Sequence, residues 1–217
     1  MPILRNMTMN DLISNAFNAL WVIFFAYWLL AALSIKRIKS AETIGSRLSY
    51  SVPIWLGYAL LLTRARPWGP LSRQMYPRSL ATALIGLGLT ALGIGFAMWA
   101  RYTLGRNWSS KVTIKIDHEL IRSGPYARVR HPIYTGILLA ILGTSIAIGE
   151  WRSFLALGLV WFAFYRKART EEKMLAQEFG ERFAEHRQRT GFFIPRLPAS
   201  KMFLSSGSAS KKTTQLL

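Results

Sequence analysis

The sequence of 217 residues contains no cysteine, three histidines and ten acidic residues. The absence of cysteine excludes a disulfide scaffold, a cysteine-ligated zinc site and a thiol nucleophile. With so few histidines and no cluster of acids, we expect no metal site. Hydrophobic residues make up 51% of the chain, which excludes a disordered basic tail protein.

Positive charge is abundant, because 28 lysines and arginines give a net charge of +18. Such a charge often indicates nucleic-acid binding. Here, however, the apolar residues form long uncharged blocks with the cations between them, which is typical of an integral membrane protein with basic cytoplasmic loops. We therefore expect membrane lipid, and no nucleic acid, among the partners.

The hydrophobic blocks predict an all-α polytopic membrane protein with about five transmembrane helices. The blocks cover residues 16–33, 48–63, 79–100, 133–149 and 151–165. The last two are nearly continuous, so they should form a tight hairpin, extended by cytoplasmic helices to Phe179 and over residues 181–189. Pro53 is expected in the first turn of its helix, and residues 199–217 should form a disordered tail.

The distribution of cations predicts the orientation. If the N-terminus is outside and the C-terminus cytoplasmic, the cytoplasmic segments hold 22 of the 28 lysines and arginines. A bacterial inner membrane is the expected location. In this topology the segment before Ile133 and the segment after Tyr165 meet at the same cytoplasmic face.

Small residues form a stripe along the third block. Gly86, Thr90, Gly93 and Ala97 are spaced by four, three and four residues. This spacing favours close helix packing in lipid, against either another helix of the chain or a second copy.

The residues capable of chemistry gather in two stretches. His131 lies at the start of a predicted helix, with Tyr134 three residues further on. Glu171 and Glu172 form an adjacent acid pair, and Lys167 lies four residues before the first of them. Simpler interpretations are a histidine that only caps its helix and a surface ion pair between Lys167 and Glu171.

Two motifs carry a family resemblance. Residues 124–136 read GPYARVRHPIYTG, and residues 171–180, after the hairpin, read EEKMLAQEFG. In this combination they resemble the isoprenylcysteine carboxyl methyltransferase family, which is related to the membrane phospholipid methyltransferases. The resemblance implies S-adenosyl-L-methionine as methyl donor. It also implies a lipophilic small-molecule or lipid-modified acceptor, such as the carboxylate of a prenylated cysteine.

The resemblance further implies residue roles and a methyltransferase core over residues 104–198, after three helices in residues 1–103. The residues implied to bind the cofactor are His118, Glu119, Leu120, Ile121, Tyr126, His131, Pro132, Ile133, Tyr134 and Glu171. The implied catalytic residues are Lys167, Glu171 and Glu172. Lys167 and Arg169 would bind the substrate, although many family members have arginine at the position of Lys167, and lysine lacks its bidentate fork.

Three other functions are also compatible with the sequence. A phospholipid or other lipid amine could be the acceptor, and it would need deprotonation by His131 or Glu172. An NADPH-dependent membrane reductase could end in a similar hairpin. A non-enzymatic membrane scaffold would use the motif residues only for packing.

Overall fold

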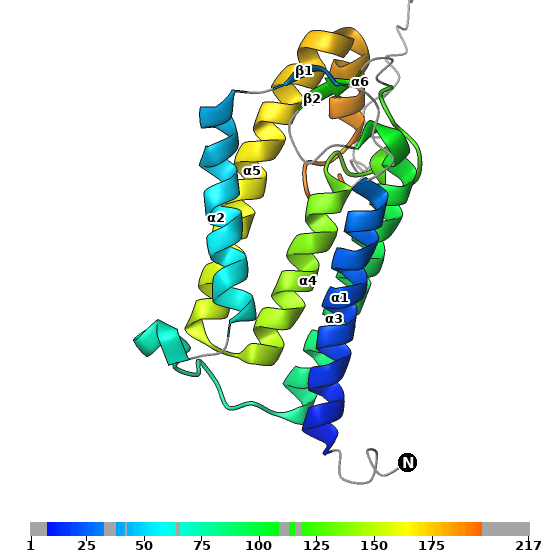
Figure 1. The fold of residues 1–217 in the computed structure, drawn as a ribbon. Helices are drawn as coiled ribbons and strands as arrows, with labels where there is room; N and C mark the ends of the chain where they lie inside the picture. Colours follow the sequence, from blue (N-terminus) through cyan, green and yellow to red (C-terminus); the bar gives the residue numbers. More distant parts are fainter. Residues whose placement is uncertain are drawn as a thin grey trace, which may run out of the picture.

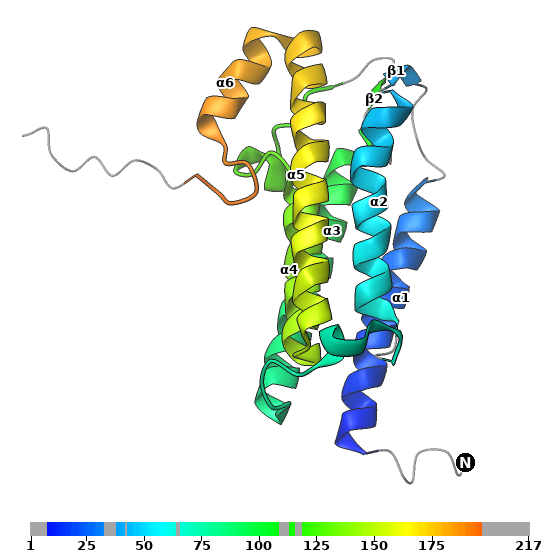
Figure 2. The ribbon, with the colours of Figure 1, turned by 90° about the vertical axis from the view of Figure 1, so that its left-hand side faces the viewer.

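The computed structural model describes residues 8–32, 38–41, 43–63, 66–108, 113–115 and 119–196. The main helices are α1 (Met9–Ala32), α2 (Ile44–Leu62), α3 (Leu80–Leu104), α4 (Pro132–Ile148), α5 (Trp151–Phe179) and α6 (Glu181–Arg189). The shorter elements are β1 (Ile38–Ala41), η1 (Arg66–Ser72), η2 (Gly105–Asn107), β2 (Thr113–Lys115) and η3 (Gly124–Ala127). The long helices lie side by side as a bundle, and α6 and the two strands lie at one end of it (Figures 1 and 2).

The helical prediction is largely confirmed. α4 and α5 form the hairpin, α5 continues without a break to Phe179, and α6 covers the predicted range. Gly180 separates the last two helices with a positive φ of 49°. The antiparallel pair of β1 and β2 adds a small sheet that an all-α class does not include.

The prediction that Pro53 lies in a first helical turn is wrong. Thr43 caps α2 by accepting a hydrogen bond from the backbone N–H of Ser46, so the helix begins at Ile44 and Pro53 lies inside it. Proline removes one backbone hydrogen bond there. The helix persists because α2 packs closely on α5: a Cβ at Gly57 would lie 2.6 Å from the Val160 side chain.

The small-residue stripe of α3 packs against α4 of the same chain. A Cβ added at Gly93 would lie 2.6 Å from the carbonyl oxygen of Gly136, and one at Gly86 would lie 2.5 Å from that of Gly143. Between them, the Thr90 hydroxyl donates to the carbonyl oxygen of Ala140 in α4 at 3.2 Å. The predicted close approach is confirmed, and a helix of the chain itself fills the stripe.

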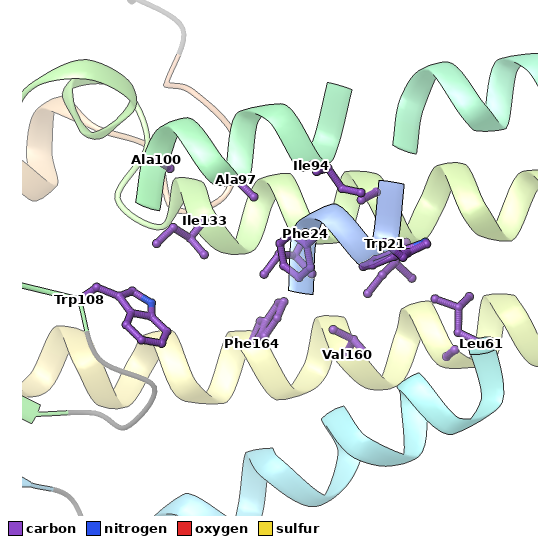
Figure 3. Packing of buried hydrophobic residues seen from close by; sticks show 14 of the residues in the cluster. Trp21, Phe24, Leu61, Ile94, Ala97, Ala100, Trp108, Ile133, Val160 and Phe164 are labelled. Atoms are coloured by element: carbon purple, nitrogen blue, oxygen red, sulfur yellow. The ribbon is translucent and has the colours of Figure 1, made fainter. Parts of the chain in front are cut away.

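Aromatic side chains fill the space between the α3–α4 pair and α5. Trp21 and Phe24 of α1 point into this space, where they meet Phe164 of α5 and, further along, Trp108 (Figure 3). All four are buried. The indole of Trp21 also donates a hydrogen bond to the Thr144 hydroxyl of α4 at 3.2 Å. This layer joins α1 to both helices of the hairpin.

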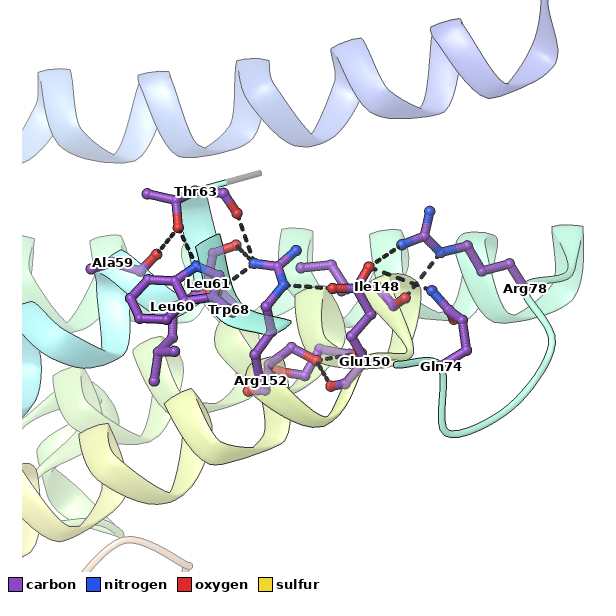
Figure 4. A network of polar contacts seen from close by, with 12 residues as sticks. Ala59, Leu60, Leu61, Thr63, Trp68, Gln74, Arg78, Ile148, Glu150 and Arg152 are labelled. Atoms are coloured by element: carbon purple, nitrogen blue, oxygen red, sulfur yellow. Dashed lines mark hydrogen bonds and ion pairs between the residues drawn. The ribbon is translucent and has the colours of Figure 1, made fainter. Parts of the chain in front are cut away.

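A buried ion pair closes the bundle at the hairpin turn (Figure 4). The Nε of Arg152 lies 2.5 Å from Glu150, and both residues are at most 5% exposed. The same guanidinium donates to carbonyl oxygens at the C-terminal end of α2, namely those of Leu60 and, at 2.8 Å, Thr63. Arg78, before α3, reaches Glu150 at 2.6 Å. A cation at a helix C-terminus is favourable, so this network ties α2 to the hairpin.

Two helices, Met9–Ala31 and Leu80–Leu104, are long and apolar enough to cross a membrane. α4 is apolar but has only 17 residues. The count of about five spans is therefore not confirmed by length and composition in the described ranges. Large apolar side chains nevertheless face outward on several helices, among them Leu29, Trp55 and Leu92, which are 66–72% exposed. Exposed apolar surface of this kind indicates contact with lipid or with another apolar partner.

Candidate functional site

The candidate site lies at the end of the bundle opposite the hairpin turn. The loop before α4 and the part of α5 that extends beyond α4 build it (Figure 2). Gly124 begins η3 with a positive φ of 56°, a conformation that favours glycine. His131 is the N-cap residue of α4, and Pro132 is its first residue, where a missing N–H costs nothing.

His131 lies between the two adjacent glutamates of α5. Its Nε2 is 3.2 Å from Oε1 of Glu172, and its Nδ1 is 3.5 Å from Oε2 of Glu171. The hydroxyl of Tyr134 donates to Glu171 at 2.5 Å, and the Nε of Arg130 donates to Glu172 at 2.6 Å. The structure thus brings together the two motifs that the hairpin topology predicted would meet.

The charges in this cluster stabilise one another. Burial favours a higher pKa for Glu172, but hydrogen bonds from His131 and Arg130 lower it to about 2. Burial likewise favours a higher pKa for Glu171, but His131 and the charge of Lys167 lower it below its ordinary value. Burial favours a lower pKa for His131, yet the two carboxylates raise it. The cluster therefore favours an imidazolium cation between two carboxylates.

The interpretation of Lys167 and Glu171 as a surface ion pair is wrong, because Lys167 is only 8% exposed. Its Nζ lies 5.3 Å from the ring centre of Tyr50 and 5.5 Å from that of Tyr134. Arg169, by contrast, lies on an exposed part of α5 and does not join this group in the described structure.

The interpretation of His131 as a simple helix cap is also wrong. Its side chain makes no capping hydrogen bond to α4. Instead, its ring is nearly parallel to that of Tyr134, with 5.7 Å between the ring centres and an interplanar angle of 8°. The contacts with the glutamates and the tyrosine therefore fix the orientation of the imidazole.

A cleft of about 600 Å³ follows the segment before η3. Its lining residues are Glu119, Leu120, Ile121, Arg122, Ser123, Phe179 and Arg182. Ile121, Tyr126 and Tyr134 belong to or pack against one hydrophobic cluster, which links this segment to the start of α4. Pro132 and Ile133 are buried in the first turn of α4. His118 lies outside the described residues.

The predicted set of site residues omitted Arg130 and the segment that covers His131. The backbone N–H groups of Arg130 and His131 donate to the carbonyl oxygens of Gly191 and Phe192 at 2.9 and 3.3 Å. The ring of Phe192 lies 4.9 Å from that of His131, and the ring of Phe193 lies 6.1 Å from it. An apolar run directly after the charged last helix was the available sequence signal.

This arrangement has the groups that the implied methyl donor would need. Glu171 keeps 24% of its side chain exposed, whereas Glu172 keeps 7%, so Glu171 can also accept hydrogen bonds from a ligand ammonium group. Tyr134 stacks on Phe164 at 4.6 Å, which adds an aromatic wall. The cleft is within the size range of small-molecule sites, and its lining includes the predicted residues Glu119, Leu120 and Ile121 but none of the charged cluster. The described residues therefore fit an amino-acid-bearing cofactor.

The candidate site lies in a part of the chain that is similar to known proteins. The family model described as phospholipid methyltransferase matches residues 81–182. Protein-S-isoprenylcysteine O-methyltransferase of Schizosaccharomyces pombe is 36% identical over 52% of this chain and 49% of its own. Cobalt-zinc-cadmium resistance protein CzcN of Cupriavidus metallidurans is 37% identical, over 52% of this chain and 50% of its own.

A third relative matches over a longer range. The probable protein-S-isoprenylcysteine O-methyltransferase of Oryza sativa subsp. indica is 29% identical over 82% of this chain and 94% of its own. The chain thus spans about half the length of the Schizosaccharomyces and Cupriavidus proteins and most of the length of the rice protein.

Proposed function

We propose that the chain belongs to the isoprenylcysteine carboxyl methyltransferase family and that it transfers a methyl group from S-adenosyl-L-methionine to a lipophilic acceptor in a membrane. The proposed acceptor group is the carboxylate of a prenylated cysteine or a similar lipid-linked carboxylate. The observation that carries this proposal is the charged cluster in which both family motifs meet, with Tyr134 bonded to Glu171 at 2.5 Å beside His131.

We assign the donor's contacts to residues at the start of α4 and in the loop before it. Glu171 would bind the ammonium group, because it is the more exposed carboxylate of the pair. The backbone around residues 118–121 and 131–134, together with Tyr126, would hold the adenosyl part and the carboxylate. When bound, the donor supplies an electrophilic methyl group on a positively charged sulfur.

The proposed reaction chiefly requires the protein to align the methyl donor with the acceptor carboxylate. An ionised carboxylate needs no general base, so positioning and the exclusion of water supply most of the catalysis. Buried Lys167 would counter the negative charge of the acceptor as it approaches. Glu172 would act as a positioning residue, because it already holds His131 and Arg130. The role of exposed Arg169 in substrate binding stays a prediction.

The same contacts favour a carboxylate over an amine acceptor. A lipid amine must lose a proton before it attacks, and Glu172 and His131 are the candidate bases. The pKa of Glu172 is about 2, so this carboxylate is a poor proton acceptor at neutral pH, and the two carboxylates raise the pKa of His131, which stabilises its protonated form. The Cupriavidus relative is named for metal resistance and not for prenylcysteine methylation. The proposal therefore specifies a carboxylate as the methyl acceptor and leaves the rest of the acceptor molecule open.

We further propose that all five long helices cross the membrane, with the N-terminus outside and the C-terminus cytoplasmic. Outward-facing apolar residues such as Trp55 of α2 and Trp161 of α5 support spans that length and composition alone do not identify. The site would then face the cytoplasm of a bacterium. Residues 104–198 would form the methyltransferase core beside the helices of residues 1–103.

Calorimetric binding of S-adenosylhomocysteine, the donor's product, tests the proposal directly. Wild-type protein should bind it, and Glu171→Gln should bind roughly 10- to 100-fold more weakly, as expected for a lost charge-assisted hydrogen bond. Glu181→Gln removes an exposed carboxylate from α6 and should bind like wild type. Undetectable binding by wild type, or equal binding by all three proteins, contradicts the proposal.

Product analysis separates the other functions. Membranes given labelled donor and an S-prenylated N-acetylcysteine should yield a base-labile methyl ester. A base-stable methylated lipid amine would instead identify an N-methyltransferase. Binding of NADPH in place of S-adenosylhomocysteine would indicate a reductase. Full biological activity of both His131→Ala and Glu171→Ala would indicate a scaffold.

A further inference from the structure

Arg101, in the last turn of α3, is a buried cation that the proposed reaction does not yet use. The residue is 2% exposed. Its guanidinium donates to the carbonyl oxygen of Gly105 at 2.8 Å and to that of Ala31, at the end of α1, at 2.6 Å. It also lies 4.5 Å from the ring centre of Trp108. These contacts fix the guanidinium in place but bring no negative charge to it.

The described residues leave this group incomplete. The Nε of Arg101 has no hydrogen-bond partner in the described structure, and neither has the Oδ1 of Asn107. Asn107 is 8% exposed and ends η2, the turn whose first carbonyl holds the guanidinium. Buried polar groups almost always have partners, and an uncompensated buried charge is costly. The unpartnered Nε–H of Arg101 is a buried cationic donor, and it indicates a place that an anionic ligand completes.

This segment lies beside the candidate active site. Burial raises the pKa of Tyr126, and the charge of Glu171 raises it further, whereas the charge of Arg101 lowers it. A Cβ added at Gly124, two residues before Tyr126, would lie 3.2 Å from the side chain of Thr103, two residues after Arg101. Trp108, Tyr126 and the first turn of α4 also belong to one hydrophobic cluster. The end of α3 that carries Arg101 therefore packs against η3, the turn that leads to the start of α4 and its charged cluster.

We propose that Arg101 and Asn107 form a binding site for the carboxylate group of a ligand in the candidate active site. The proposal rests on the proposed function and narrows its ligands to anionic ones. The free Nε–H is a charge-assisted donor. The unpartnered Oδ1 of Asn107 is an acceptor, so this amide binds a carboxylate only with its NH₂ group turned toward the ligand. Trp108 and Trp28, with 5.8 Å between their ring centres, give the guanidinium apolar surroundings in which its attraction to an anion is strong.

Two molecules in the proposed reaction carry a carboxylate. One is the methyl donor, through its amino-acid part, and the other is the lipophilic acceptor. Both satisfy the same chemistry, and an ammonium group would be repelled by the guanidinium. If the donor's carboxylate occupies the site, the affinity for the donor depends on Arg101 and Asn107. If the acceptor's carboxylate occupies it, the affinity for the acceptor depends on them.

Binding of matched ligand pairs to the purified full chain tests the site. The first pair is S-adenosylhomocysteine and its decarboxylated analogue, and the second is an S-prenylated N-acetylcysteine and its carboxamide. Asn107→Asp is the informative variant, because it places a carboxylate in the same short segment as Arg101 with little change of shape. Arg101→Lys is the second variant, and Gln177→Glu, the same change of charge on an exposed part of α5, is the control.

We expect Asn107→Asp to weaken the carboxylate member of one pair by roughly 10- to 100-fold, the range for a charge-assisted hydrogen bond, and to spare the neutral member. If only the adenosyl pair loses its preference for the carboxylate member, the donor occupies the site. If only the prenyl pair loses this preference, the acceptor occupies it. A purely structural role would leave both preferences unchanged, because Asn107→Asp would only neutralise Arg101.

The outcomes separate this inference from the proposed function. If wild type binds neither S-adenosylhomocysteine nor the prenylated cysteine, the proposed function fails and this inference falls with it. If wild type binds them and both variants keep carboxylate preferences within twofold of wild type, only the inference is overturned. Should Asn107→Asp fail to fold, the same comparison with Arg101→Lys decides, with the thermal unfolding midpoint as the check of folding.

Discussion

Replacing Glu172 with glutamine removes the charge that joins α5 to the loop before α4. The Glu172 side chain is 7% exposed and bonds Arg130 at 2.6 Å and His131 at 3.2 Å. Glutamine keeps the shape but cannot balance two cations. Breaking a buried ion pair by removing one partner is costly because the remaining charge stays buried. We therefore expect Glu172→Gln to destabilise the folded protein.

The size of the effect follows from the pKa of this carboxyl. Lowering the pKa from its ordinary value of 4.5 to about 2 corresponds to about 3 kcal/mol of stabilisation of the charged form. Since the folded-state pKa is depressed, this stability is present above pH 4.5 and is lost as the pH falls from 4.5 toward 2. Glu172→Gln should lose it at neutral pH and show less acid dependence in that range.

Thermal and denaturant unfolding of the detergent-solubilised protein would measure this change. Glu185→Gln is the matched control, because Glu185 also pairs with two arginines, at 2.8 and 3.2 Å, but its side chain is 48% exposed. Exposed pairs contribute about 0–1 kcal/mol. Two results would refute the argument that burial makes this carboxylate different. One is an equal loss of unfolding free energy in the two variants, and the other is an unchanged pH dependence of the stability of Glu172→Gln at acid pH.

Other substitutions test the packing around the site. Gly93→Ala should cost about 1–3 kcal/mol in unfolding experiments, because its Cβ would meet the α4 backbone; Gly95→Ala, with open space around it, should instead stabilise by about 1 kcal/mol. Gly191→Ala should weaken S-adenosylhomocysteine binding in calorimetry, since its Cβ would collide with the carbonyl oxygen of Ile194 and displace the segment over His131. Arg152→Leu should lower stability by about 3–5 kcal/mol, because it leaves a buried carboxylate at the hairpin turn.

The sequence predicts those features that depend on spacing along the chain. Two apolar blocks with almost nothing between them must form an antiparallel hairpin, and an antiparallel hairpin brings its two outer ends together. The contact between His131 and Glu171 follows from that geometry. The packing of Gly93 is predictable in the same way, because small residues at helical spacing mark one face of one helix.

Features that depend on the return of distant segments could not be predicted. The apolar run after α6 indicates that this segment is buried, but it does not indicate that the chain folds back and pairs at Gly191 with the loop around Arg130. Arg101 looks like one more cation in a basic loop, and only the structure shows it buried and bonded to Ala31. The predicted position of Pro53 was wrong because local propensity places proline at helix starts, whereas packing against α5 stabilises a helix on both sides of it.

The two ends of the bundle use similar buried charges for different purposes, and hydrogen-bond satisfaction distinguishes them. At the hairpin turn, Arg152 has Glu150 and several carbonyl oxygens as partners, and none of its buried atoms lacks a hydrogen bond in the described structure. At the opposite end, Arg101 and Asn107 each keep a buried atom without a partner in the described structure, and Glu171 stays partly exposed. A satisfied buried charge stabilises the fold, whereas an unsatisfied one raises its free energy until something binds. This difference is why we assign the first network to structure and the second to ligand binding.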